Sequence, residues 1–169
     1  MLSPAARPDA PVARLREAVD RILATNPGIG NYESGCIDVS AALRAALQRE
    51  GIETELVMIE PSLGSLQTMT LRGERAEGKI HGFLVFRQRG EEVIIDPTVQ
   101  QFFKGPAGSV PRAFVGTRDD AATLFTREQE RLQVEIDADP QTGQYDPLAF
   151  TELVYGLGAY RSLRFYAGS

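Results

Sequence analysis

The chain has 169 residues, 43% of them hydrophobic and 24% charged, a composition that suffices for one buried core and excludes a wholly disordered protein. The net charge of −5 argues against a protein that binds nucleic acid through a basic surface. With one cysteine and one histidine, the chain cannot form an internal disulfide, a multi-cysteine zinc site or a two-histidine metal site.

The N-terminus and the apolar runs bear on localisation and domain organisation. No apolar run approaches the roughly 20 residues of a membrane span, and the first residues lack the basic start and apolar stretch of a signal peptide. We therefore expect a soluble protein that acts in the cytoplasm or is delivered by a dedicated secretion system. Residues 1–11 are rich in proline and small residues and are predicted to form a flexible arm or linker. Residues 12–169 are predicted to form a single domain.

Two helices are predicted in the first third of the chain. An apolar rhythm with helical spacing runs from Val12 to the break at residues 26–28, where a proline ends it. A glycine-rich loop over residues 28–35 precedes a second helix over residues 36–50. Ser34 is the predicted N-cap of this second helix.

Strands are predicted in the middle of the chain. Residues 54–59 form a β-rich run, and residues 80–87 and 93–95 are apolar runs joined by a turn at residues 88–91. Between the runs over residues 54–59 and 80–87, residues 61–78 are polar and contain glycine, which predicts a long loop. Loops of this length in a compact domain are usually lids, binding loops or disordered segments.

The last third of the chain mixes both kinds of element. A short strand is predicted at residues 114–115, helical segments at residues 119–125 and 127–134, and a final helix that begins at Asp146. Together these elements predict an α+β fold in which N-terminal helices pack on a small antiparallel β-sheet.

The single cysteine, Cys36, stands at the start of the second predicted helix, directly after Gly35. The first amides of a helix have no partner within the helix and favour an anion. A thiolate is stabilised at such a position, which lowers its pKa, and the same amides can hold a developing oxyanion. The placement indicates a nucleophilic thiol; the other interpretation is a small buried core residue.

The single histidine, His81, and Asp96 lie on the two strands of the predicted hairpin. With a turn of two or four residues, Arg87 faces Glu92. In that register His81 is a diagonal neighbour of Asp96 on one face of the sheet, whereas a three-residue turn would separate them. An aspartate that holds one imidazole nitrogen leaves the other for the thiol, which is the arrangement of nucleophile, base and orienting group in a catalytic triad.

A glycine-preceded cysteine that opens a helix, a strand with a histidine, and a second strand ending in Asp-Pro-Thr form a pattern that resembles the papain-like and transglutaminase-like cysteine hydrolases. The matching stretches are residues 35–43, 51–52, 81–85 and 93–98. Residues 100–102 and 114–117 are similar to segments of compact bacterial papain-fold toxin and deamidase domains.

The resemblance implies a papain-like or transglutaminase-like core with Cys36 as nucleophile, His81 as general base and acid, and Asp96 as the orienting group. Papain-like proteases often place a glutamine before the cysteine as an oxyanion donor; here Asn31 is the candidate. Phe83 stands where transglutaminase-like proteins more often have tryptophan. The chemistry needs no cofactor or metal, and calcium is not implied, because no acidic loop has the ordered ligand spacing of a calcium site.

The predicted function is a cysteine hydrolase that acts on an amide through a thioester intermediate. Protein deamidation and peptide cleavage are preferred, and transglutamination by an amine acceptor shares the same chemistry. The expected partners are a protein substrate and, if the domain is the effector or toxin part of a bacterial protein, a cognate inhibitor or immunity protein.

A non-catalytic protein-binding module on the same scaffold is the alternative. In that case Cys36 and His81 would be core residues, and the predicted loop over residues 61–78 would be the recognition surface. A structural or assembly protein without any site is the third interpretation.

Overall fold

The structure is a computed structural model that describes part of the chain. The described residues are 10–31, 34–59, 69–71, 74–75, 81–104, 109–132, 134–136, 151, 154–155 and 165–166.

The α-helices are α1 (Ala10–Thr25), α2 (Cys36–Arg49) and α3 (Arg118–Arg127), and the short 3-10 helices are η2 (Pro27–Ile29), η4 (Val99–Phe102) and η5 (Gln129–Arg131). The main sheet contains β1 (Glu55–Ile59), β4 (His81–Gln88), β5 (Glu91–Asp96), β6 (Phe114–Gly116) and β8 (Phe165–Tyr166). A second, smaller sheet contains β2 (Met69–Leu71), β3 (Glu74–Arg75) and β7 (Val134–Ile136).

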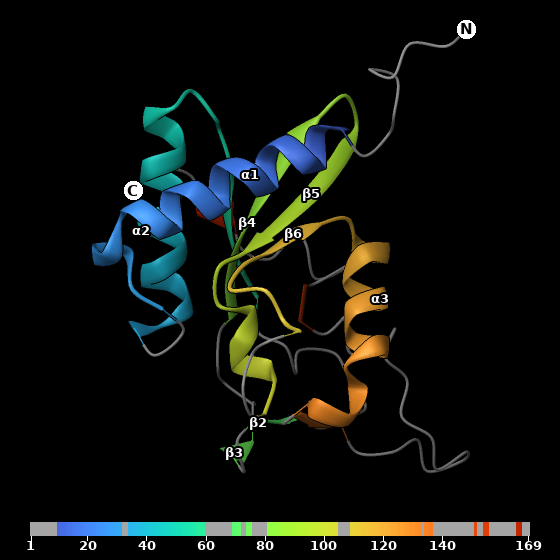
Figure 1. The fold of residues 1–169 in the computed structure, drawn as a ribbon. Coiled ribbons are helices and arrows are strands. Elements are labelled where there is room, and N and C mark those ends of the chain that lie inside the picture. Colours follow the sequence, from blue (N-terminus) through green and yellow to red (C-terminus); the bar gives the residue numbers. More distant parts are fainter. Residues whose placement is uncertain are drawn as a thin grey trace, which may run out of the picture.

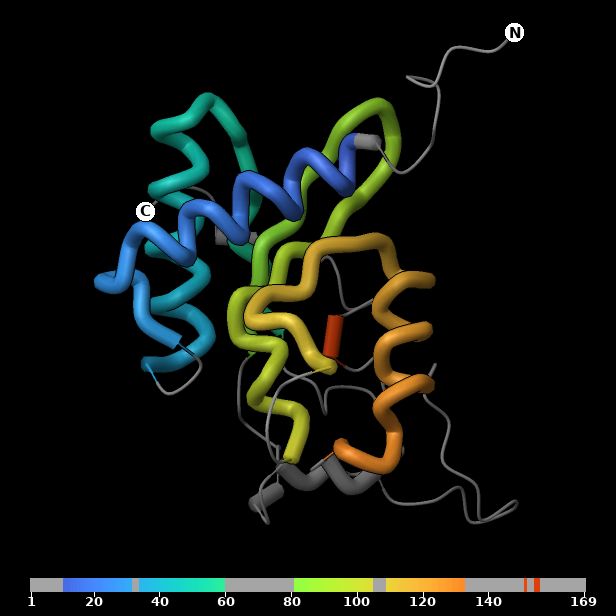
Figure 2. Tube along the Cα trace, viewed as in Figure 1, coloured from blue at the N-terminus to red at the C-terminus, as the bar shows by residue number. Residues whose placement is uncertain are grey.

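The main sheet has the strand order β6-β5-β4-β1-β8, and every neighbouring pair is antiparallel. Helices α1 and α2 lie on one side of this sheet and α3 lies on the other (Figure 1). The chain trace in Figure 2 follows the same arrangement, from α1 and α2 through the sheet to α3. The predicted α+β fold, with N-terminal helices on an antiparallel sheet, is confirmed.

The sheet buries both of its faces, which follows from the alternation of side chains along a strand. On β4, Leu84 points into the cluster formed with α1 and α2, whereas Phe83 and Val85 point into the cluster that contains Phe125 of α3. All four side chains are at most 4% exposed. The face that carries Phe83 is also the face on which His81 lies, two residues earlier on the strand.

The β4–β5 hairpin has the register that the sequence predicted. Arg89 and Gly90 have φ values of 53° and 79°, the left-handed pair expected of a tight two-residue hairpin turn. Consequently Gln88 pairs with Glu91, and Arg87 pairs with Glu92.

Several predicted boundaries and elements differ from the structure. Helix α1 begins at Ala10, so the last two residues of the predicted arm are helical, while residues 1–9 lie outside the described part. Helix α2 ends at Arg49 rather than at residue 50. For the final helix, residues 151 and 154–155 are helical, but its predicted start at Asp146 lies outside the described residues.

Two segments have a different type of structure from the one predicted. The predicted loop over residues 61–78 contains β2 and β3, and the end of the predicted helix over residues 127–134 meets β7, which pairs with β2. The Met-Thr-Leu and Val-Glu-Ile sequences of β2 and β7 alternate apolar and polar residues, a pattern typical of strands. The remainder of the predicted loop lies outside the described residues.

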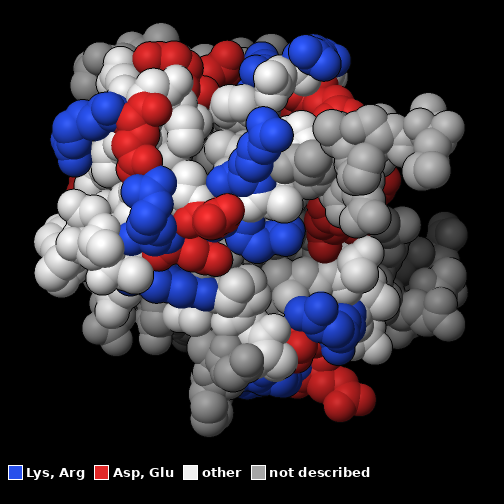
Figure 3. All heavy atoms as spheres, turned by 45° about the horizontal axis from the view of Figure 1, so that its top comes forward, with Lys and Arg blue, Asp and Glu red and all other residues white. Residues whose placement is uncertain are grey.

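The surface of the described part carries charges of both signs. Figure 3 shows acidic and basic side chains intermingled over one face of the molecule. An exposed pair, Arg21 with Glu50, joins α1 to the end of α2 at 2.6 Å. Within the described residues, no helix is both long enough and apolar enough to cross a membrane.

Candidate active site

Cys36 is the first residue of α2, and Gly35 is the N-cap. The φ of Gly35 is 96°, a left-handed conformation that favours glycine, and residue 35 provides no side-chain cap. The prediction that Ser34 is the N-cap is therefore wrong, because the chain enters the helix through a backbone turn that needs glycine. This entry leaves the first amides of α2 uncapped by a side chain and directed toward the space before the helix.

Gly82 holds the thiol from the neighbouring strand. Its backbone N–H donates to Sγ of Cys36 at 3.4 Å. A Cβ atom at position 82 would lie 3.0 Å from Cγ1 and 3.3 Å from Cα of Ile37, so a larger residue would push Ile37 away and glycine favours this close approach of α2 to β4. At the other end of the same residue, the buried hydroxyl of Ser40 donates to the carbonyl of Gly82 at 3.2 Å. The helix start and the strand are thus joined at one residue by two hydrogen bonds.

His81 precedes Gly82 and is bonded to Asp96. The ring of His81 is 4% exposed, and its Nε2 lies 2.9 Å from Oδ2 of Asp96. An ionised carboxylate only accepts hydrogen bonds, so Nε2 carries the proton and Nδ1 is left for the thiol. Nδ1 is buried and has no hydrogen bond of standard geometry among the described residues. The predicted pairing of His81 with Asp96 is present in the structure.

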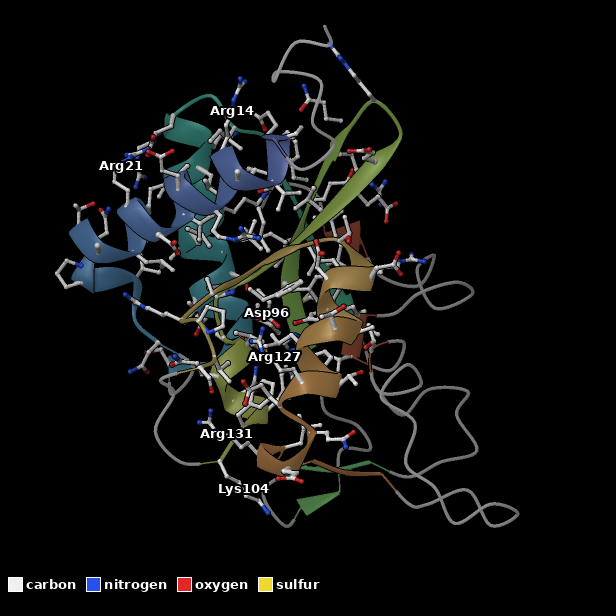
Figure 4. The ribbon with its side chains drawn as sticks, turned by 45° about the vertical axis from the view of Figure 1, so that its right-hand side comes forward. Arg14, Arg21, Asp96, Lys104, Arg127 and Arg131 are labelled. Carbon is white, nitrogen blue, oxygen red and sulfur yellow. The ribbon has the colours of Figure 1, made fainter. Side chains whose placement is uncertain are left out.

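Asp96 is fully buried, and four donors surround its carboxylate. Oδ1 accepts hydrogen bonds from the backbone N–H and the hydroxyl of Thr98, at 2.9 Å and 3.0 Å. Oδ2 accepts hydrogen bonds from His81 and from the hydroxyl of Tyr155, the latter at 3.0 Å. Gln101 in turn donates to the Thr98 hydroxyl at 2.9 Å. Figure 4 shows Asp96 in the interior, whereas Arg14 and Arg21 lie on the outer side of α1.

Aromatic rings enclose the imidazole. The ring of Phe83 stacks on that of His81 at a centroid distance of 5.6 Å, and the ring of Phe102 meets it edge-on at 5.1 Å. Tyr155 closes a third side at 6.0 Å. These apolar walls exclude water from the ring and fix its plane, so the hydrogen bond to Asp96 determines the tautomer.

The thiol and the imidazole shift each other's ionisation. Burial raises the pKa of the Cys36 thiol. The hydrogen-bonding capacity and charge of the His81 imidazole, and the amide of Gly82, lower it by more, so the pKa of Cys36 is below its ordinary value of 9.0. Burial likewise opposes the imidazolium of His81, yet the charge and hydrogen bond of Asp96, and then the thiol, raise the pKa of His81 from 6.5 to about 10. At neutral pH both shifts favour a thiolate beside an imidazolium.

Asn31, the candidate oxyanion donor, lies between η2 and α2 and is exposed. Its backbone carbonyl accepts a hydrogen bond from the amide of Ser34 at 2.9 Å. Its role at an oxyanion stays a prediction. No group of three or more His, Cys, Asp or Glu side chains converges on a metal position in the described part of the chain.

Three further residues of this arrangement, Thr98, Ser40 and Tyr155, were not predicted as site residues from the sequence. Thr98 was identified only within the Asp-Pro-Thr pattern, although an aspartate side chain often accepts a hydrogen bond from the backbone N–H two residues later, in an Asx turn. Ser40 could have been found as a polar residue on the apolar face of α2. For Tyr155 no local signal exists, because 59 residues separate it from Asp96.

The reactivity of Cys36 gives a direct test of these pKa shifts. At pH 6 to 7 we expect iodoacetamide to alkylate Cys36 at least several-fold faster in the folded protein than in the urea-unfolded chain, because more of the folded thiol is ionised. The same thiol in the unfolded chain is the reference, since the sequence has one cysteine. The measurement is the rate of mass change followed by mass spectrometry.

The His81→Ala variant is the control for the ion pair. It should slow alkylation of the folded protein at neutral pH, because the imidazolium no longer stabilises the thiolate. Equal rates in the folded and unfolded chains, unchanged by His81→Ala, would contradict a thiolate–imidazolium pair.

Comparisons with known proteins give little at the level of sequence. No family model matches the chain, and no curated protein matches it either. Among solved structures, the chain is similar to Pasteurella multocida toxin, from work titled "Crystal structures reveal a thiol-protease like catalytic triad in the C-terminal region of Pasteurella multocida toxin". The TM-score is 0.49 and the sequence identity 16%, over 89% of this chain. The chain spans 20% of the length of that toxin chain.

Proposed function

We propose that the chain is a cysteine hydrolase that acts on protein amides, with Cys36 as nucleophile, His81 as general acid and base, and Asp96 as the orienting group. The observation that carries this proposal is the fixed tautomer of His81. Its Nε2–H is bonded to a buried carboxylate, so Nδ1 is the nitrogen that can exchange a proton with the thiol at the helix start. The pKa of Cys36 supports the same reading, because burial alone would raise it, whereas His81 and the amide of Gly82 bring it below its ordinary value.

The first half of the reaction is acylation of Cys36. The thiolate attacks the carbonyl carbon of the amide, an S–C bond forms, and the π electrons move to the oxygen. The backbone N–H of Cys36 stabilises the oxyanion, with Asn31 as the candidate second donor. When the C=O bond re-forms, the C–N bond breaks, and the proton on Nδ1 of His81 passes to the leaving nitrogen. A thioester and a neutral imidazole remain.

The second half is deacylation. Water attacks the thioester carbon while Nδ1 of His81 takes one of its protons. Collapse of this intermediate breaks the C–S bond, releases a carboxylic acid and restores the thiolate–imidazolium pair. Throughout both steps Asp96 holds Nε2–H and stabilises the positive charge without accepting the proton.

The leaving group and the acceptor distinguish three reactions with this chemistry. Release of a peptide amine is proteolysis, and release of ammonia from a glutamine or asparagine side chain is deamidation. A lysine amine in place of water gives transglutamination. Deamidation and proteolysis are the preferred reactions, and the proposed setting is an effector or toxin domain of a bacterial protein with a protein substrate.

Incubation with a proteome tests the proposed function. The full chain and its Cys36→Ala variant are added to separate samples of a cell lysate, which are then compared by quantitative mass spectrometry. New peptide termini would identify a protease, amide-to-acid conversions a deamidase, and isopeptide cross-links a transglutaminase. The proposal predicts that one of these changes occurs with the wild type and not with Cys36→Ala. Identical proteomes would contradict it and would favour the binding module.

A further inference from the structure

The hydroxyl of Tyr155 contacts the carboxylate of Asp96 from a distant part of the chain. The two oxygens of the Asp96 carboxylate differ in where their donors come from. Both donors of Oδ1 belong to Thr98, two residues along the chain. Oδ2, the oxygen bonded to His81, also accepts a hydrogen bond from Tyr155 at 3.0 Å, across 59 residues of sequence.

We propose that Tyr155 is a positioning residue of this site, whose hydroxyl fixes Oδ2 of Asp96 and shares the charge of that oxygen with His81. Through Asp96, Tyr155 sets the orientation and the basicity of the imidazole. This inference rests on the proposed function for its effect on turnover. Its effect on His81 does not depend on any substrate.

The ring of Tyr155 does not by itself explain the hydroxyl. The ring is enclosed by other aromatic side chains: Phe83 meets it edge-on at 5.1 Å, and Phe114 and Phe125 stack on it at 6.0 Å each. A phenylalanine would make the same ring contacts. Because Tyr155 is 2% exposed, its hydroxyl needs a buried partner, and the partner it has is the oxygen that orients His81.

The hydroxyl remains a donor over the range of pH in which the site would work. Burial, and then the charge and hydrogen bond of Asp96, raise the pKa of Tyr155 well above its ordinary value of 10.0. A hydrogen bond from a neutral hydroxyl to a carboxylate is charge-assisted and stronger than one between neutral groups. Tyr155 therefore withdraws electron density from Oδ2 and restrains its rotation, while Thr98 restrains Oδ1.

Removal of the hydroxyl would change His81 in a defined direction. Without Tyr155, Oδ2 would have His81 as its one remaining donor described in the structure, and the imidazolium would be held more tightly. The pKa of His81 should rise, and the imidazolium should become a poorer acid toward the leaving nitrogen. A carboxylate with one fewer restraint also orients the ring less well.

Nuclear magnetic resonance of the Tyr155→Phe variant tests the inference. Because His81 is the one histidine of the chain, ring-labelled histidine gives a single set of signals that report its tautomer, its Nε2–H hydrogen bond and its pKa. In Tyr155→Phe we expect the Nε2–H proton to move downfield and the pKa of His81 to rise. If turnover is found, kcat should fall about tenfold, the effect of losing one charge-assisted hydrogen bond, with KM unchanged.

The matched control is Phe125→Leu, which changes the packing around Tyr155 but removes no polar atom. It should leave the Nε2–H signal and the pKa of His81 as in the wild type. Unchanged His81 signals in Tyr155→Phe would overturn the inference and make Tyr155 a core residue. Shifted signals in a protein without Cys36-dependent activity would support the positioning role and contradict the hydrolase function. Cys36-dependent activity together with unchanged His81 signals in Tyr155→Phe would support the hydrolase function and overturn the positioning role.

Discussion

Replacement of Cys36 by alanine should abolish turnover, with a loss of at least about 10⁴-fold in kcat, because no other group among the described residues can form the thioester. His81→Ala should have a loss of similar size. The double variant should be no worse than either single variant, since residues that act as one unit lose their shared function once. The measurement is kcat on the substrate identified from the proteome.

Measurements of folding distinguish a loss of chemistry from a loss of structure in these variants. Cys36→Ala removes one atom from a half-buried position and should leave the circular dichroism spectrum and the unfolding midpoint close to those of the wild type. The ring of His81 is buried, so His81→Ala leaves a cavity and should lower stability. His81→Gln, which fills more of the space of the ring, is therefore the better variant for separating loss of the base from loss of stability. A folded Cys36→Ala protein with full biological effect would rule out the hydrolase.

Asp96→Asn should reduce kcat less than these changes, or at most comparably. The amide oxygen can still accept the hydrogen bond from Nε2–H of His81. Its NH₂ group would then face the backbone N–H and the hydroxyl of Thr98, which are donors. The nucleophile remains in place while the base is misoriented. Loss of turnover by Asp96→Asn without loss of iodoacetamide reactivity at Cys36 would separate orientation of the base from formation of the thiolate.

The core of the candidate site could be predicted because its determinants are local. The turn residues Arg89 and Gly90 adopt the left-handed conformations of a two-residue turn, and the resulting register places His81 and Asp96 on the same face of the sheet. Cys36 was recognisable from its position after a glycine at a helix start. In each case a few neighbouring residues determine the geometry, so spacing along the chain is sufficient evidence.

The remaining parts of the site could not be predicted because they depend on long-range packing. Tyr155 reaches Asp96 from the last part of the chain, and its aromatic neighbours come from β4, β6 and α3. The preference for glycine at position 82 comes from Ile37 of α2, which only the docking of the helix brings near. Similarly, β7 pairs with β2 and begins at Val134, the last residue of the predicted helix over residues 127–134.

A large loss of stability is expected for Asp96→Ala. Its carboxylate satisfies two donors of Thr98, the hydroxyl of Tyr155 and Nε2–H of His81, all of them buried. Removing one partner of a buried, hydrogen-bonded ion pair costs about 3–5 kcal/mol in the free energy of unfolding. Urea unfolding of Asp96→Ala against the wild type measures the loss, and Asp96→Asn, which keeps the shape and one acceptor, should lose less.

The pH dependence of this loss identifies His81 as its source. The pKa of His81 is raised from 6.5 to about 10 in the folded protein. The stability that its charge contributes is therefore fully present below pH 6.5 and is lost as the pH rises toward about 10. The loss caused by Asp96→Ala should be largest near pH 6 and should shrink steadily up to pH 10. A background of Cys36→Ala in both proteins removes the opposite contribution of the thiol, whose pKa is lowered. It also removes the part of the His81 shift that the thiol causes, so in this background the decline should end below pH 10. A stability loss that stays constant from pH 6 to 10 would show that the charge of His81 does not contribute, and would leave only the unsatisfied hydroxyl and amide donors to explain it.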